Sequence, residues 1–61
     1  MTSEEIKLAL KAKKYTQPMI ASELEKSQPA IHLVIEKKSV SKKIQDHICG
    51  ILGKTFKEVW G

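Results

Sequence analysis

The chain contains no arginine, and only one of its 61 residues is a cysteine. A single cysteine cannot form an intrachain disulfide, and no Cys/His cluster has the spacing of a structural zinc site. The sequence also lacks an apolar run of membrane-spanning length. A chain this short buries only about 60% of the surface that it exposes when unfolded. We therefore expect one small domain over residues 1–61, without metal or cofactor, stabilised by compact packing or by oligomerisation.

Lysine supplies all of the positive side-chain charge. The eleven lysines oppose seven acidic residues, which leaves a net charge of +4 and favours a polyanionic partner. Lysine contacts phosphate as a point charge and lacks the bidentate fork with which arginine reads guanine, so the excess indicates affinity for a nucleic-acid backbone more than base recognition. The charged start of the chain, residues 1–5, lacks the apolar stretch of a signal peptide, and we expect a cytoplasmic protein.

The spacing of apolar residues predicts five short helices and no strand. The expected helices cover about residues 3–14, 17–24, 27–36, 41–52 and 55–60. Thr2 and Glu5 have the spacing of a capping box, and Thr16, Ser27 and Ser41 are hydroxyl residues suited to cap the next three helices. The second and third helices each carry a proline in the first turn, where the backbone N–H groups are unpaired in any case.

The apolar faces of these helices give an expected core. Its members are Ile6, Leu10, Ile20, Ala21, Leu24, Ile31, Val34, Ile44, Ile48, Leu52 and Phe56. Trp60 is suited either to close this core or to form a dimer contact. Gly53 is expected to end the fourth helix in a left-handed conformation. Gly50 inside that helix costs about 1 kcal/mol relative to alanine, unless it lets another helix or a second subunit approach closely.

Residues 17–36 form a candidate helix-turn-helix, because two short helices are joined by a turn of about three residues. The small side chain of Ala21 lies where the two helices are expected to cross. The string Thr16-Gln17-x-x-Ile20-Ala21-x-x-Leu24-x-x-Ser27-Gln28-x-Ala30-Ile31 resembles the lambda-repressor and Cro-like helix-turn-helix regulators. The downstream segments Ser39-Val40-Ser41-Lys42-Lys43-Ile44, Leu52-Gly53-Lys54 and Phe56-x-x-Val59-Trp60 resemble more narrowly the Ner-like phage transcriptional regulators.

Two residues of the expected turn depart from the pattern of that family. Glu25 stands where a glycine in a left-handed conformation is usual, and Lys26 stands where a buried valine is usual. If the turn geometry is kept, Glu25 costs about 1 kcal/mol of strain relative to glycine. Otherwise the turn is rebuilt, and the helix that follows is aimed differently.

The resemblance implies a lambda-repressor-like all-α domain that binds double-stranded DNA and regulates transcription, as a repressor of phage or prophage type. Helix 27–36 would enter the major groove and read bases through Ser27, Gln28, Pro29, His32 and Leu33. Gln28 would be the principal reader, since its amide can pair with adenine, while Pro29 and Leu33 can touch a thymine methyl group. Phosphate contacts are expected from Gln17, Lys37, Lys38, Ser39, Ser41, Lys42 and Lys43. We expect a homodimer that forms mainly on DNA, because one such helix reads few base pairs.

Two other functions stay open at this point. The fold could serve as a protein-binding module, like a toxin antidote or a phage adaptor, through helix 27–36 or the Trp60 end. It could also bind DNA without sequence preference, as an architectural protein, which the lysine-only charge permits. We do not expect an enzyme, because nothing around Cys49 supplies the paired base and oriented third group of a nucleophilic site.

Overall fold

The computed structural model describes residues 1–61 and consists of five helices without a β-strand. The helices are α1 (Ser3–Ala12), α2 (Gln17–Leu24), α3 (Gln28–Ile35), α4 (Lys42–Leu52) and α5 (Phe56–Trp60). The prediction of a small all-α bundle of five short helices is therefore confirmed. Only the end of α1 lies two residues earlier than expected, because Lys14 takes a left-handed conformation with φ of 61°. No helix has both the length and the hydropathy that crossing a lipid bilayer requires.

Hydroxyl side chains cap four of the five helices. At α1, Thr2 Oγ1 accepts a hydrogen bond from the N–H of Glu5 at 3.2 Å, and the Glu5 carboxylate accepts one from the N–H of Thr2 at 2.7 Å, which completes the predicted capping box. Thr55 and Glu58 form the same box at α5. Ser41 precedes α4, but its ψ of 108° differs from the 154–165° of the bonded caps, and its hydroxyl makes no capping bond. The prediction of a side-chain cap by Ser41 is thus wrong.

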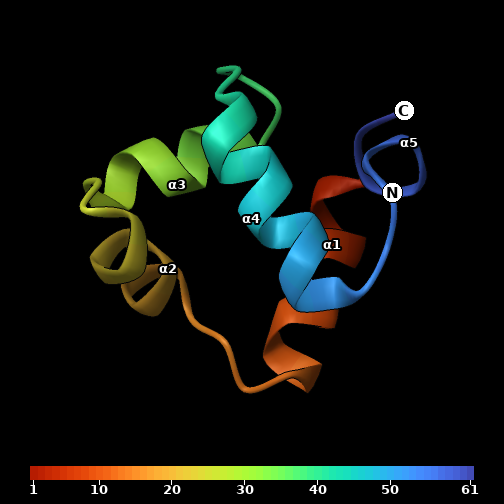
Figure 1. Cartoon of the computed structure of the whole chain (residues 1–61), viewed down its shortest axis with the longest axis horizontal. Coiled ribbons are helices and arrows are strands. Elements are labelled where there is room, and N and C mark those ends of the chain that lie inside the picture. Colours follow the sequence, from red (N-terminus) through yellow and green to blue (C-terminus); the bar gives the residue numbers. More distant parts are fainter.

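The three helices α1, α3 and α4 pack against one another in the middle of the domain. α2 packs on α3, and α5 packs on α4, so that α2 and α3 lie on one side of the molecule and α5 on the other (Figure 1). The chain ends meet beside α5, where the α-amino group of Met1 donates hydrogen bonds to the carbonyl oxygens of Glu58 and Val59 at 3.2 and 3.0 Å. α2 and the first turn of α3 therefore lie away from both chain ends (Figure 1).

One hydrophobic cluster joins all five helices. Its buried members are Ile6, Leu10, Ile20, Ala21, Ile31, Val34, Ile35, Ile44, Ile48, Cys49, Leu52 and Val59. Most of the predicted core is confirmed, and Leu24 packs against it while half-buried. Phe56 was wrongly predicted as a core residue, since its side chain is 40% exposed and Val59 is fully buried instead. Phe56 and Val59 are three residues apart and share one side of α5, but Val59 takes the buried position, while Phe56 at the first residue of the helix stays partly exposed.

A polar contact joins the first turn of α4 to the last residue of α5. The indole Nε1 of Trp60 donates a hydrogen bond to the backbone oxygen of Gln45 at 3.1 Å, and Gln45 is itself buried. The half-buried Trp60 therefore closes the core, one of the two roles left open for it. Gly53 ends α4 in the predicted left-handed conformation, with φ of 66°. Gly50 is exposed, and no atom of the chain lies within 4 Å of the place where a Cβ would stand, so no other helix approaches closely there.

Candidate nucleic-acid interface

The helices α2 and α3 are joined by residues 25–27, and each starts at a hydroxyl cap. Thr16 Oγ1 accepts from the N–H of Met19, and Ser27 Oγ accepts from the N–H of Ala30, both at 3.3 Å. Both predicted caps are confirmed. The first turn of each helix contains a proline, which removes an N–H that would have no partner there. Local sequence thus sets where the second helix of the pair begins, and with it which residues occupy its exposed first turn.

Glu25 keeps the left-handed turn that was one of the two expected outcomes. Its φ and ψ are 55° and 42°, values at which glycine is favoured over a residue with a Cβ. The turn is closed by a hydrogen bond of 2.9 Å from the N–H of Lys26 to the carbonyl oxygen of Ala21. Lys26 is exposed, so it does not replace the buried valine of the family pattern. The turn is therefore intact, but it carries strain at one residue.

The exposed face of α3 carries the residues that the sequence predicts as base readers. Ser27, Gln28, Pro29, His32 and Leu33 are all exposed, whereas Ile31, Val34 and Ile35 face the core. Gln28, Pro29 and His32 line a surface hollow, and Gln17 from the start of α2 completes its wall. The structure therefore brings one predicted phosphate-binding residue next to three predicted base-reading residues. Leu33 lies one turn beyond Pro29 and does not line the hollow.

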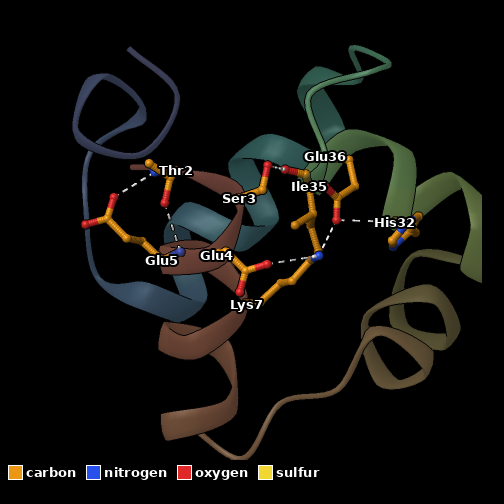
Figure 2. A network of polar contacts seen from close by, with 8 residues as sticks. All are labelled: Thr2, Ser3, Glu4, Glu5, Lys7, His32, Ile35 and Glu36. Carbon is orange, nitrogen blue, oxygen red and sulfur yellow. Dashed lines mark hydrogen bonds and ion pairs between the residues drawn. The ribbon is translucent and has the colours of Figure 1, made fainter.

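A charged network behind the C-terminal end of α3 was not foreseen from the sequence (Figure 2). Lys7 of α1 forms an ion pair with the half-buried carboxylate of Glu36, and it lies 3.8 Å from Glu4 Oε1. The hydrogen bond from Lys7 lowers the pKa of Glu36 and raises the pKa of Lys7. His32 Nε2 lies 4.0 Å from Glu36 Oε2, so the carboxylate borders the exposed face of α3.

Ser3 makes a second link between α1 and α3, since its hydroxyl donates to the carbonyl oxygen of Ile35 at 2.9 Å (Figure 2). This bond occupies a carbonyl group at the end of α3 that has no partner within the helix. Together, Ser3 and Lys7 fix the position of α3 relative to α1. The four-residue spacing of His32 and Glu36 is visible in the sequence, but no sequence signal pairs Lys7 with Glu36.

The loop between α3 and α4 carries most of the predicted phosphate-binding residues. It folds back on α3, because the N–H groups of Lys38 and Ser39 both donate to the carbonyl oxygen of Leu33, at 2.9 and 3.3 Å. Lys37 takes a left-handed conformation with φ of 62°, and its Nζ donates to the carbonyl oxygen of Met1 at 2.6 Å. Ser41 is half-buried at the start of α4. This loop follows the C-terminal end of α3, whereas Gln28 and Pro29 of the hollow lie in the first turn of that helix.

The lysines of the candidate interface differ in whether they form ion pairs with acidic side chains. Lys42 lies 3.9 Å from Asp46 one turn further along α4, whereas Lys38 and Lys43 are exposed and take part in none of the ion pairs. Several carboxylates are engaged elsewhere, since those of Glu5 and Glu58 accept hydrogen bonds from the N–H groups that precede their own helices. Lys38 and Lys43 are thus exposed lysines of this region that lie outside the ion pairs.

Cys49 and the two histidines lie in separate places. Cys49 is buried, and burial raises the pKa of its thiol, so the thiol is protonated at neutral pH. His47 contacts Glu23, whereas His32 lies on the exposed face of α3. No three side chains of the His, Cys, Asp or Glu types are grouped so that they could hold a metal ion.

Comparison with known proteins adds no relative to this description. No protein-family model matches the chain, and neither a curated protein nor a solved structure is similar to it.

Proposed function

We propose that this protein binds double-stranded DNA in a sequence-dependent manner and regulates transcription. In this proposal α3 lies in the major groove, with Gln28 and His32 directed to base edges. Gln17 and the loop between α3 and α4 bind phosphates on either side of the groove. The resemblance to Cro-like and Ner-like regulators supports the same reading of residues 16–60, and repression is the form of regulation that it implies.

The observation that carries the proposal is the α2–turn–α3 unit with its left-handed Glu25. A non-glycine residue at φ of 55° is strained. The fold nevertheless retains this turn geometry, and a turn rebuilt without the strain would aim α3 differently. The same unit leaves Gln28 and His32 exposed at a shared hollow. Free lysines at the far end of α3 add the positive charge that a phosphate backbone attracts.

One α3 reads too few base pairs to find a site in a genome, so the proposal includes two copies on one duplex. Two copies related by a two-fold axis would read two half-sites about one helical turn apart. Because one α3 contacts few base pairs, we expect the pair to form mainly when DNA is present.

The proposal is tested by repeated selection of bound duplexes from a random DNA library at moderate salt. We expect an enriched motif with two-fold symmetry. Gln28→Ala should then relax the preference at one base position by about 1–3 kcal/mol. Retention of DNA without enrichment would instead indicate an architectural binder, and no retention would refute the proposal.

Phosphate binding is tested separately by the salt dependence of affinity for the selected duplex. Each of Lys38→Ala and Lys43→Ala should weaken binding to all sequences alike and reduce the slope of log K against log salt by about 1 per subunit. Lys57→Ala is the matched control, because Lys57 is exposed on α5, a helix outside the proposed interface. Equal slopes for all three variants would mean that the loop does not face the phosphates.

A protein-binding module is the second candidate, because several exposed side chains are apolar. Leu33 is 42% exposed, Phe56 40% and Val40 84%. A partner protein would cover such side chains, and binding to it would depend little on salt. A result in which the intact, folded chain does not bind DNA would favour this function.

A further inference from the structure

The exposed face of α3 is unusual for a surface that contacts DNA, because it has no positive side chain. No lysine lies between Gln28 and Ile35, and the chain has no arginine. The acidic residue that follows the helix, Glu36, is ion-paired with Lys7. The exposed face therefore offers one amide, Gln28, one imidazole, His32, and two apolar side chains, Pro29 and Leu33.

These side chains discriminate between the two kinds of base pair in the major groove. A guanine shows two acceptors, which arginine or lysine reads best, and a cytosine shows an amino donor, which a free carboxylate reads best. α3 offers no lysine, arginine or free carboxylate, and the neutral imidazole of His32 can donate only one hydrogen bond to a guanine. An adenine accepts and donates to an amide in a bidentate pair, and a thymine shows a methyl group that apolar side chains contact.

The two apolar side chains are placed to act together. Pro29 and Leu33 are four residues apart on one helix, so they are neighbours on the same strip of its surface. Leu33 leaves 42% of its surface in water, although the core beside it has fully buried positions such as Ile31 and Ile35. Gln28 adjoins Pro29 at the wall of the hollow. With α3 in the major groove, the amide and the apolar strip would therefore face consecutive base pairs.

Resting on the proposed function, we infer that the half-site read by α3 is composed mainly of A·T pairs, in which thymine methyl groups pack on Pro29 and Leu33 and an adenine pairs with Gln28. Recognition then depends on methyl groups more than on charge. The lysines at residues 38 and 43 supply affinity without contributing to this choice.

The test replaces thymidine by deoxyuridine, one position at a time, in a duplex obtained from the random-library selection. Deoxyuridine removes the methyl group and keeps the base-pairing edge. We expect the affinity to fall about fourfold at each position where a methyl group packs on the strip. At one of these positions, the Leu33→Ala variant should bind the thymidine and deoxyuridine duplexes with equal affinity. Leu8→Ala is the control and should keep the fourfold ratio, because Leu8 lies exposed on α1.

The results separate this inference from the function on which it rests. If duplexes are selected but their half-sites are rich in G·C pairs, or deoxyuridine changes nothing, the inference is wrong and sequence-specific binding stands. A deoxyuridine effect that persists in both Leu33→Ala and Pro29→Ala would place the methyl contact elsewhere and also overturn it. If no duplex is retained, the proposed function is refuted together with this inference, and the apolar strip on α3 would instead be a contact for a protein.

Discussion

Glu23 on α2 and His47 on α4 are in hydrogen-bond contact, with 2.8 Å between Glu23 Oε1 and His47 Nε2. The other oxygen of the same carboxylate accepts a hydrogen bond from the hydroxyl of Tyr15 at 2.8 Å. One side chain thus joins the segment before α2, α2 itself and α4. This contact holds α2 against α4 and against the segment that precedes α2.

The Glu23 carboxylate makes the stability of the domain depend on acid. The hydrogen bond from His47, followed by that from Tyr15, lowers the pKa of Glu23 below its ordinary value of 4.5. A carboxyl group with a lowered folded-state pKa stabilises the fold above the ordinary value, and this contribution is lost as the pH falls through the lowered value. Glu23→Gln should therefore unfold at a lower temperature at neutral pH and show a shallower loss of stability as the pH falls below the ordinary value of 4.5.

Thermal unfolding followed by circular dichroism across that pH range checks this prediction. Glu25→Gln is the matched control, because the Glu25 carboxylate has no partner among the hydrogen bonds and ion pairs of the same helix end. Identical pH profiles for Glu23→Gln and the unaltered protein would contradict the role given to the contact.

The strain at Glu25 can be removed by substitution. Glu25→Gly should raise the free energy of unfolding by about 0.5–1 kcal/mol, because glycine takes the left-handed conformation at little cost but has more freedom in the unfolded chain. Glu25→Asn should stabilise by less. Glu25→Ala keeps the Cβ and removes the charge, so urea denaturation of this variant separates backbone strain from electrostatics. A stabilised Glu25→Ala would show that charge, not backbone strain, is the cause.

Two glycines of α4 should respond in opposite directions to the same substitution. Gly50→Ala should stabilise by about 1 kcal/mol, since helix propensity favours alanine and the site is open. Gly53→Ala should destabilise by about 1 kcal/mol, since φ there is 66°. Chemical denaturation of both variants measures the difference, and a destabilised Gly50→Ala would mean that the position is constrained by something other than this chain.

The ion pair between Lys7 and Glu36 should affect DNA binding without touching DNA. Lys7→Met leaves the Glu36 carboxylate unneutralised beside His32, where it repels phosphate, and we expect affinity to fall about two- to fivefold. The double variant Lys7→Met/Glu36→Gln should recover most of that loss. Fluorescence anisotropy with the selected duplex measures both values, and a double variant as weak as Lys7→Met would show that Lys7 acts in another way.

The elements that depend on local sequence were the predictable ones. Capping side chains and the period of apolar residues are short-range signals, and they located α2 and α3 and the inward positions of most helices. The misplaced Phe56 belongs to a five-residue helix whose apolar residues all share one side, so packing on α4, and not spacing, decides which of them is fully buried. The contacts of Lys7 with Glu36 and of Glu23 with His47 join different helices, and their formation depends on packing that spacing along the chain does not reveal.

Trp60 is the only tryptophan of the chain, and it is half-buried where α5 meets α4. Its indole is therefore an intrinsic optical probe of one junction, whose emission shifts when α5 separates from Gln45 and water reaches the ring. Because α3 lies on the other side of the domain (Figure 1), a ligand bound there leaves this fluorophore outside its contact area. The intact protein can thus report its own folding without an attached label, through a signal that ligand binding at α3 leaves unchanged.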